Sequence, residues 1–286
     1  MNFLSLKTCL GLWVLVLAAA GPAFSQASPP TKAGTGAYLT SFDGVKIYYE
    51  VQGQGPPVLL LHGFASTLGT WQGTPLYREL LAQGHQVVAL DLRGNGQSGK
   101  PAALTGYEHD AEARDVIGLA MALGFAHYQV VGYSRGSIIA ARVLVLDSRV
   151  TAAVLGGMGE AFTSPDWPRR IAFYKALSGE APAKELDGFL QMVQARGLDR
   201  QALAWQQQAQ PSTSPAALAK IHVPVLVIAG ADDNDNGSAE ALARLVPGAT
   251  LRRVPGVHNT TAQSPQFAHE VLNFLQNNHP KPSASK

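Results

Sequence analysis

The chain has 286 residues, of which 46% are hydrophobic and 15% are charged, a composition typical of one folded domain with a sizeable core. It carries 22 lysines and arginines against 20 aspartates and glutamates, for a formal net charge of +2. This near-neutral balance excludes the broad basic face that nucleic-acid binding requires, and the apolar content excludes disorder over most of the chain.

The N-terminus has the three parts of a secretory signal peptide. Lys7 supplies a positive charge, residues 9–20 form an apolar run, and small residues follow that run. The run is too short for a comfortable membrane span, so we expect cleavage of residues 1–27 and no stable membrane anchor. An uncleaved anchor is the alternative. Because the single cysteine, Cys9, would leave with this segment, a disulfide-free periplasmic or extracellular bacterial protein is predicted.

Two polar segments flank the predicted fold. Residues 28–36 contain two prolines and two glycines and are expected to form a linker. Residues 279–286 are polar and proline-containing and are expected to form a disordered tail. The folded domain is therefore predicted over residues 37–278.

From residue 37 onward, apolar runs alternate with segments of helical period. Residues 38–40 and 45–51 predict a hairpin that turns at Asp43 and Gly44. Short apolar runs follow, separated by amphipathic helices, as in a parallel sheet buried on both faces. The predicted strands are residues 58–61, 87–90, 130–131, 152–155, 225–228 and 250–254, and the predicted helices are about 75–82, 109–123 and 265–275. We therefore predict an α/β fold with a mostly parallel, doubly wound sheet, whose ligands bind at the carboxyl ends of the strands.

Residues 130–136 are the most informative stretch of the chain. The sequence Gly132-Tyr133-Ser134-Arg135-Gly136 lies between a predicted strand and a predicted helix and matches the Gly-x-Ser-x-Gly pattern of a nucleophile elbow. Because glycine has no Cβ, strand and helix can pack closely around a sharply turned serine. The Ser134 hydroxyl would then project toward a bound substrate.

Regular alternation stops between residues 160 and 220. Three helix-like stretches there carry aromatic and aliphatic side chains, and we expect a short helical cap that excludes water and shapes a pocket. Most of these aromatic side chains are expected to pack the cap onto the core. The candidates for lining the substrate pocket are Trp71, Trp167, Phe173 and Trp205.

Five motifs follow the predicted strands in a characteristic order. They are His62-Gly63-Phe64, residues 91–98, the elbow at Ser134, residues 230–233, and Gly256-Val257-His258. With these motifs the sequence resembles the α/β-hydrolase superfamily, in its group of small capped serine esterases, haloperoxidase-like enzymes and C–C hydrolases. The resemblance covers about residues 37–278 and implies an α/β-hydrolase fold with a short helical cap.

A serine hydroxyl needs a base to take its proton, and histidine has the pKa for that role near neutral pH. His258 is the candidate base, since the other histidines fall at strand starts or helix flanks, in the final helix, or in the turn at His62. The resemblance implies that His62 supports the neighbouring loop structurally.

The third member of a triad is a carboxylate that orients the imidazole. By resemblance it is Asp233, which gives the order Ser134, Asp233, His258 that this fold uses. Asp232 and Asp235 are alternatives close by in the same loop. Glu160, after the strand at residues 152–155, occupies another position from which some relatives supply the acid.

The resemblance also implies an oxyanion hole formed by the backbone N–H groups of Phe64 and Arg135. The Arg135 side chain could contact an acidic substrate group, but we favour its folding back over the elbow helix. Residues 232–237 match the first half of a calcium loop. The closing position is Ala243 and not glutamate, and the segment follows a strand and not a helix, so calcium is not expected there. No metal and no cofactor are predicted for the protein.

The sequence therefore predicts a serine hydrolase that cleaves carboxylic esters of small-molecule substrates through an acyl-enzyme. Lactonase, C–C hydrolase and cofactor-free perhydrolase activities use the same triad and stay open. Relatives with an aspartate nucleophile are disfavoured because residue 134 is serine. A non-catalytic ligand-binding or sensory protein is the alternative from another class.

Overall fold

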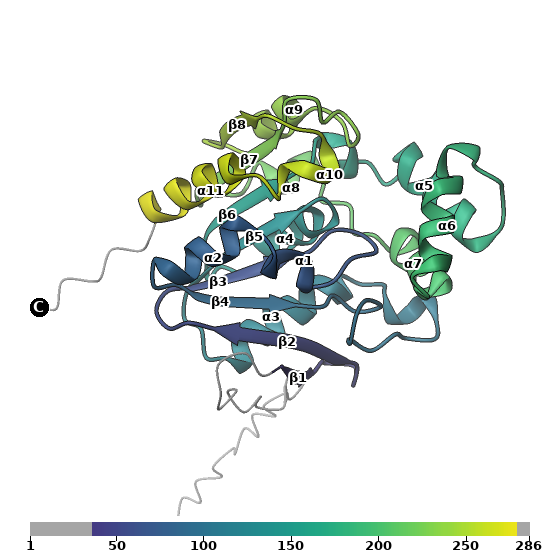
Figure 1. Cartoon of the computed structure of the whole chain (residues 1–286), viewed down its shortest axis with the longest axis horizontal. Coiled ribbons are helices and arrows are strands. Elements are labelled where there is room, and N and C mark those ends of the chain that lie inside the picture. The colour runs from purple at the N-terminus through teal and green to yellow at the C-terminus, as the bar shows by residue number, and fades with distance from the viewer. Residues whose placement is uncertain (1–35, 279–286) are drawn as a thin grey trace, which may run out of the picture.

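A computed structural model of the chain describes residues 36–278, so the predicted signal peptide, nearly all of the linker and the tail lie outside the described residues. Within this range an eight-stranded sheet forms the centre of the molecule (Figure 1). Its strands are β1 (Ala37–Thr40), β2 (Lys46–Gln52), β3 (Pro57–Leu61), β4 (Gln86–Leu90), β5 (Tyr128–Tyr133), β6 (Val150–Gly156), β7 (Val225–Gly230) and β8 (Thr250–Val254).

The strand order across the sheet is β1-β2-β4-β3-β5-β6-β7-β8. β2 pairs antiparallel with both β1 and β4, and all other neighbours are parallel. In the middle of the sheet, Leu61 of β3 is in register with Leu90 of β4 and with Gly132 of β5. The predicted α/β fold with a mostly parallel sheet is confirmed.

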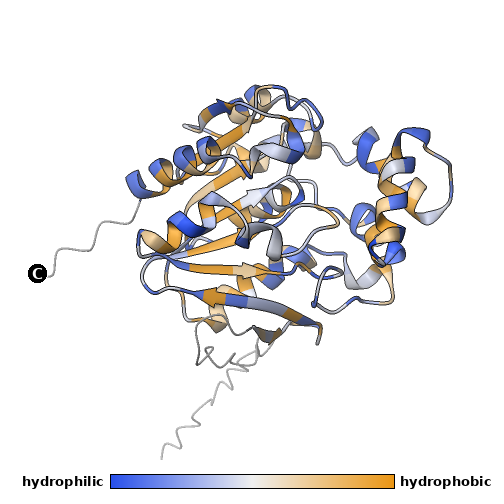
Figure 2. Ribbon diagram, in the orientation of Figure 1, coloured by the Kyte–Doolittle hydropathy of each residue, from blue (hydrophilic) through white to orange (hydrophobic). Residues whose placement is uncertain are grey.

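Helices cover both faces of the sheet because its central strands are apolar on both sides. Val58 and Leu60 of β3 belong to one buried cluster, whereas Leu59 and Leu61 belong to the other. Figure 2 shows the strands as largely hydrophobic and the outer surfaces of the helices as largely hydrophilic. One face carries α1 (Gly69–Gln72), α2 (Pro75–Ala82) and α11 (Pro265–Asn277), and the other carries α3 (Ala111–Ala122), α4 (Arg135–Leu146), α8 (Pro215–Leu218) and α9 (Ala239–Leu245).

The segment between β6 and β7, residues 160–220, carries three helices that stand apart from the sheet at one side of the molecule (Figure 1), namely α5 (Pro168–Ser178), α6 (Asp187–Ala195) and α7 (Arg200–Gln208). The last helix of the segment, α8, instead packs against the sheet. We call this whole segment the cap. Its long helices have a small buried cluster of their own, with Leu177, Val193 and Leu203, and this cluster also includes Ala65 from the loop after β3. The cap also contains η2 (Glu160–Thr163) and η3 (Lys184–Leu186).

The loop after β4, residues 91–98, is a structural element. Arg93 is fully buried, and its guanidinium donates to both carboxylate oxygens of Asp115 at 2.7 and 2.6 Å and to Asp43 at 2.7 Å. Burial alone would lower the pKa of Arg93, but these carboxylates raise it, so the buried guanidinium stays charged. The short η1 (Leu104–Gly106) follows this loop.

Among residues 36–278, no helix is long and apolar enough to cross a membrane.

Candidate active site

The turn between β5 and α4 holds Ser134 in an uncommon backbone conformation, with φ 54° and ψ −120°. A non-glycine residue adopts such angles only where its surroundings enforce them. The flanking glycines are required by close packing: a Cβ on Gly132 would lie 2.2 Å from the carbonyl oxygen of Gly136, and one on Gly136 would lie 2.0 Å from that of Leu61. The elbow motif thus reflects the space available between strand and helix.

The structure brings Ser134, His258 and Asp233 together from three separate strand ends. His258 opens α10 (His258–Thr261) after β8, and its Nε2 lies 3.0 Å from the Ser134 Oγ. Its Nδ1 lies 2.9 Å from Oδ2 of Asp233, in the loop after β7. With Nδ1–H donating to the carboxylate, Nε2 is free to accept the serine proton.

Asp233 is buried, with 6% of its surface exposed. Burial favours a higher pKa for Asp233, but the hydrogen bond and charge of His258, together with the backbone N–H of Asp235, outweigh it and lower the pKa. Asp233 is therefore ionised at neutral pH and can stabilise a positively charged imidazole.

Of the four candidate carboxylates, all within the described residues, Asp233 is the one that bonds His258. Asp232 is exposed, and the Asp235 side chain, 49% exposed, lies 3.7 Å from Arg169 of the cap. Glu160 accepts a hydrogen bond from the backbone N–H of Ser238 at 2.5 Å, so it orders the loop before α9.

Asp233, Asp235 and His258 each place one possible metal-ligand atom within 4.8 Å of the others. Nδ1 of His258 and Oδ2 of Asp233, however, are already joined by the hydrogen bond that orients the ring. A metal ion at these atoms would disrupt that bond, and Asp235 is a solvent-exposed carboxylate of the kind common without a metal. The site therefore fits proton transfer better than metal binding.

The loop that carries Phe64 is held by two buried polar side chains. The backbone N–H of Leu92 donates to Nε2 of His62 at 3.0 Å, and that of Leu68 donates to Asp91 at 2.7 Å. Burial lowers the pKa of His62, so the ring is neutral, and Nδ1–H donates to the carbonyl of Gly63 at 2.7 Å. Phe64 is thereby fixed beside the elbow.

Phe64 and Arg135 line the same cavity as Ser134. Arg135 is the first residue of α4, where a backbone N–H has no partner within the helix. An N–H at that position can stabilise negative charge that develops on a substrate oxygen.

The Arg135 side chain, which we expected to fold back over its own helix, instead pairs with Glu112 of α3. Both side chains are 3% exposed, and the guanidinium donates to the two carboxylate oxygens at 3.1 and 2.5 Å. Its charge is therefore already compensated and is not available to a substrate anion. Glu112 was missed because nothing in its spacing marks it as a partner of the elbow.

The cavity in front of Ser134 has a volume of about 440 Å³ and lies between the strand ends and the cap. Its aromatic wall is made by Phe64, Phe173 and Phe189, with the Phe64 ring stacked on Phe189 at 5.7 Å and edge-on to Phe173 at 5.9 Å. Phe189 was not predicted, because an apolar residue of a cap helix looks the same in sequence whether it faces a pocket or a core.

Two of the four predicted pocket residues line this cavity, and two do not. Trp167 and Phe173 belong to its wall. Trp71 is 2% exposed because α1 turns it into the core between α2 and the sheet. Trp205 lies against Tyr107, with 6.0 Å between the ring centroids, and so packs the cap onto the body of the domain. The predicted pocket roles of Trp71 and Trp205 are wrong.

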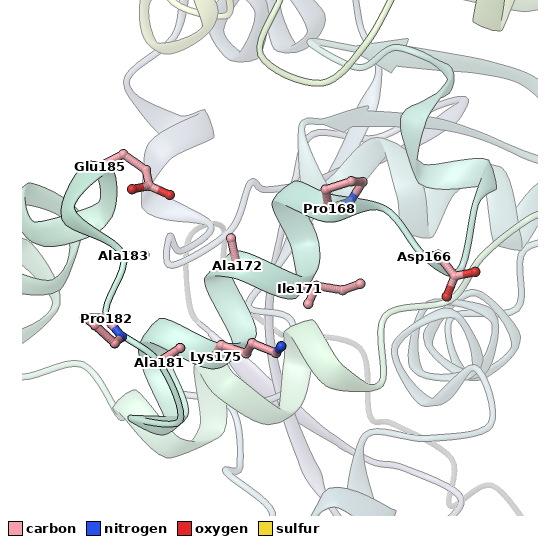
Figure 3. Close-up of a pocket in the computed structure, with 9 residues that line it drawn as sticks. All are labelled: Asp166, Pro168, Ile171, Ala172, Lys175, Ala181, Pro182, Ala183 and Glu185. Atoms are coloured by element: carbon pink, nitrogen blue, oxygen red, sulfur yellow. The ribbon is translucent and has the colours of Figure 1, made fainter.

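A second pocket, of about 390 Å³, lies within the cap between α5 and residues 181–185, and Figure 3 shows the side chains that line it. Glu185 lines both this pocket and the cavity at Ser134. Neither Ser134 nor His258 lines the second pocket, so the chemistry belongs to the first cavity.

Comparison with known proteins agrees with this geometry. Residues 56–187 match a family model described as alpha/beta hydrolase fold. A non-heme chloroperoxidase from Streptomyces lividans is 30% identical over 279 residues, covering 83% of this chain and 99% of that protein. A fluoroacetate dehalogenase from Burkholderia sp is 38% identical over 122 residues, or 41% of this chain and 39% of that protein.

The crystal structure of an esterase from Rhodococcus sp. ECU1013 superposes with a TM-score of 0.65 at 27% identity, covering 85% of this chain and 99% of the esterase. The fold, the order of the motifs and these likenesses agree with one another. The chain belongs to the α/β-hydrolase fold family, in its haloperoxidase and esterase group, and the family supports hydrolase activity.

Proposed function

We propose that the protein is a serine hydrolase that cleaves carboxylic esters through an acyl-enzyme intermediate. The observation that carries this proposal is the contact of Ser134 Oγ with His258 Nε2 at 3.0 Å, with Asp233 on the other ring nitrogen. A base at this distance can take the hydroxyl proton as the oxygen attacks.

The reaction follows from these contacts in two halves. Ser134 Oγ forms a bond to the ester carbonyl carbon while its proton passes to His258, and the backbone N–H groups of Phe64 and Arg135 stabilise the negative oxygen. The bond to the alcohol oxygen then breaks, and His258 returns the proton to that oxygen. Water adds to the acyl-enzyme by the same steps and releases the acid, which restores Ser134.

The wall of the cavity favours a small or aromatic ester-like substrate. Phe64, Phe173 and Phe189 place apolar surface beside Ser134, where an acyl or alcohol group would bury its own apolar surface. Lactones and carbon–carbon bonds next to a carbonyl could be cleaved by the same triad, so they belong in the substrate panel.

The likeness to a non-heme chloroperoxidase favours a second candidate, perhydrolysis. In that reaction hydrogen peroxide replaces water: its oxygen adds to the acyl carbon, the bond to Ser134 breaks, and a peracid leaves. His258 would take the proton from the peroxide as it does from water.

The shorter likeness to a fluoroacetate dehalogenase does not favour halide displacement. A carboxylate nucleophile forms an ester, which water can hydrolyse, but Ser134 would form an ether with the substrate carbon and would not be regenerated. We therefore do not propose dehalogenation or epoxide opening.

Titration with a fluorophosphonate probe tests the proposal, with Ser134→Ala as the matched variant. We expect stoichiometric labelling of the wild type and none of the variant. Absence of Ser134-dependent labelling would favour a ligand-binding or sensory role. Rates on p-nitrophenyl esters from acetate to palmitate and on a lactone, with and without hydrogen peroxide, then separate the remaining reactions.

We also propose that the protein is exported and that residues 1–27 are removed. The arrangement of Lys7, an apolar run and small residues supports this proposal. N-terminal sequencing of protein from fractionated cells tests it: we expect a periplasmic or secreted product that begins near residue 28. A cytoplasmic product that begins at Met1 would contradict it.

A further inference from the structure

The two residues expected to form the oxyanion hole also bind the cap through their side chains. The Phe64 ring packs against Phe173 of α5 and Phe189 of α6. The Arg135 guanidinium donates to the backbone carbonyl of Gln206 at 2.9 Å and to Oε1 of Gln210 at 3.3 Å. For Phe64 and for Arg135, the predicted oxyanion N–H and the side chain that contacts the cap therefore belong to the same residue.

Glu112 fixes the Arg135 side chain from the body of the domain. It lies in the first turn of α3, and both of its carboxylate oxygens accept from the guanidinium. A bidentate ion pair between a planar guanidinium and a planar carboxylate has one preferred geometry. Both side chains are only 3% exposed, so little water competes for these hydrogen bonds. Without the carboxylate, a buried guanidinium would lack its counter-charge and would turn away from this position.

Gln206 gives α7 a second attachment at the same place. The side-chain Nε2 of Gln206 donates to the backbone carbonyl of Arg93 at 2.9 Å, while the backbone carbonyl of Gln206 accepts from the Arg135 guanidinium. The side chain is fully buried. The cap helix α7 is thus bonded on one side to the loop after β4 and on the other to the first residue of α4.

We propose that Glu112 is a positioning residue for catalysis: by holding Arg135, it fixes α7 and the oxyanion hole in one arrangement. The position of the cap then sets the rate of the chemical step as well as the access of substrate. This inference rests on the proposed ester hydrolysis. The physical reason is that oxyanion donors act only when they already point at the oxygen on which charge develops.

The chain offers a matched control at the same helix interface. Arg142 of α4 pairs with Asp110, the residue that precedes α3, through two hydrogen bonds of 2.7 Å. This pair also joins α3 to α4, but neither Arg142 nor Asp110 lines the cavity at Ser134. Asp110 has φ 59°, which asparagine tolerates, so Asp110→Asn removes the charge with little backbone cost.

The test compares Glu112→Gln with Asp110→Asn in the full-length protein on p-nitrophenyl acetate. We expect Glu112→Gln to lower kcat about tenfold with KM nearly unchanged. This loss is smaller than the roughly 10²–10³-fold loss on removing an oxyanion donor, because the backbone N–H of Arg135 is displaced and not deleted. Asp110→Asn should change kcat by less than about twofold. Equal losses of kcat in the two variants would overturn the proposal.

The inhibition constant of phenylboronic acid would not change if Glu112 only helped to pack the helices together. The boron of this inhibitor bonds to Ser134 Oγ and places a negative oxygen where the oxyanion forms, so its inhibition constant should rise by the same factor as kcat falls. A parallel rise of KM and the inhibition constant would mean uniform loss of binding and would contradict the proposal. If Glu112→Gln does not fold, Gln210→Ala removes one contact between Arg135 and the cap and should lower kcat by a smaller factor; because Gln210 also lines the cavity, its KM is not used in the comparison.

Hydrogen exchange tests the coupling without activity. Glu112→Gln should speed exchange in peptides covering residues 62–68 and 200–208, and Asp110→Asn should leave both unchanged. Unchanged exchange in Glu112→Gln would refute the coupling. A wild type with no Ser134-dependent turnover would refute the proposed function instead, so the two failures are distinguishable.

Discussion

The hydroxyl of Tyr133 donates a hydrogen bond of 2.6 Å to the backbone carbonyl of His258. Tyr133 directly precedes the nucleophile, and its ring lies 5.5 Å from the imidazole of His258. Burial raises the pKa of Tyr133, so its hydroxyl remains a donor at neutral pH. The residue before Ser134 therefore fixes the main chain of the base that activates Ser134.

Tyr133→Phe should lower kcat with little change in KM. One neutral hydrogen bond is worth about 0.5–1.5 kcal/mol, which corresponds to a factor of about 2–12 in rate. Tyr128→Phe is the matched control, because Tyr128 is buried on the same strand but bonds Asp147 away from the cavity. Steady-state kinetics of both variants check this, and equal kcat values for the two variants would contradict it.

Asp233→Asn should reduce kcat on the order of 10⁴-fold, because an amide favours the wrong imidazole tautomer and cannot stabilise its charge. Asp235→Asn removes an exposed carboxylate two residues away, and its pair with Arg169 is worth at most about 1 kcal/mol, or about fivefold. Ester hydrolysis rates measure both. A larger loss in Asp235→Asn than in Asp233→Asn would identify Asp235 as the orienting acid.

Ser134→Gly should be more stable than Ser134→Ala. The positive φ of residue 134 costs a residue with a side chain about 1–3 kcal/mol, and the chain entropy of glycine costs about 0.5–1 kcal/mol, so the midpoints of the two ranges leave a difference of about 1 kcal/mol in favour of glycine. Urea unfolding of the two inactive variants measures the difference. Ser137, inside α4, should show the opposite order, with glycine less stable than alanine by about 1 kcal/mol. Equal stabilities at position 134 would mean that its backbone is unstrained.

The contribution of His62 to the free energy of unfolding should fall as the pH drops below about 6.5, whereas Asp115, whose pKa burial raises to about 6, contributes the opposite sign below that pH. Burial lowers the pKa of His62 in the folded state, so below the unfolded pKa the unfolded chain binds a proton that the folded chain does not. The slope is at most about 1.4 kcal/mol per pH unit for this group. Asp233, whose folded pKa is also lowered, adds the same sign of dependence below about pH 4. Urea unfolding between pH 8 and pH 5 measures the effect, and His62→Gln should reduce the slope; an unchanged slope would contradict the assignment.

The elements of the fold could be predicted because their signals are local. The hairpin of β1 and β2, the apolar runs of the parallel strands and the elbow at Ser134 each follow from a few consecutive residues. The elbow glycines were recognisable in sequence because two main chains pass within contact distance there, which only glycine permits.

Contacts between distant side chains could not be predicted in the same way. Trp71 and Phe189 are both apolar residues on short amphipathic segments, yet Trp71 enters the core and Phe189 lines the cavity. The pairing of Arg135 with Glu112 joins residues 23 positions apart on two helices. Which face a helix turns to the sheet is decided by tertiary packing, and residue spacing alone does not encode it.

The central claim is that Ser134 becomes acylated during turnover because His258 takes its proton. Acid-quenched mass spectrometry of the enzyme during p-nitrophenyl acetate hydrolysis tests it most directly. We predict one acetyl group on the peptide that contains Ser134, formed in a burst with p-nitrophenol and absent in Ser134→Ala and His258→Ala. Full turnover with no acetyl group on that peptide, or with acetylation that persists at the same rate in His258→Ala, would contradict the account.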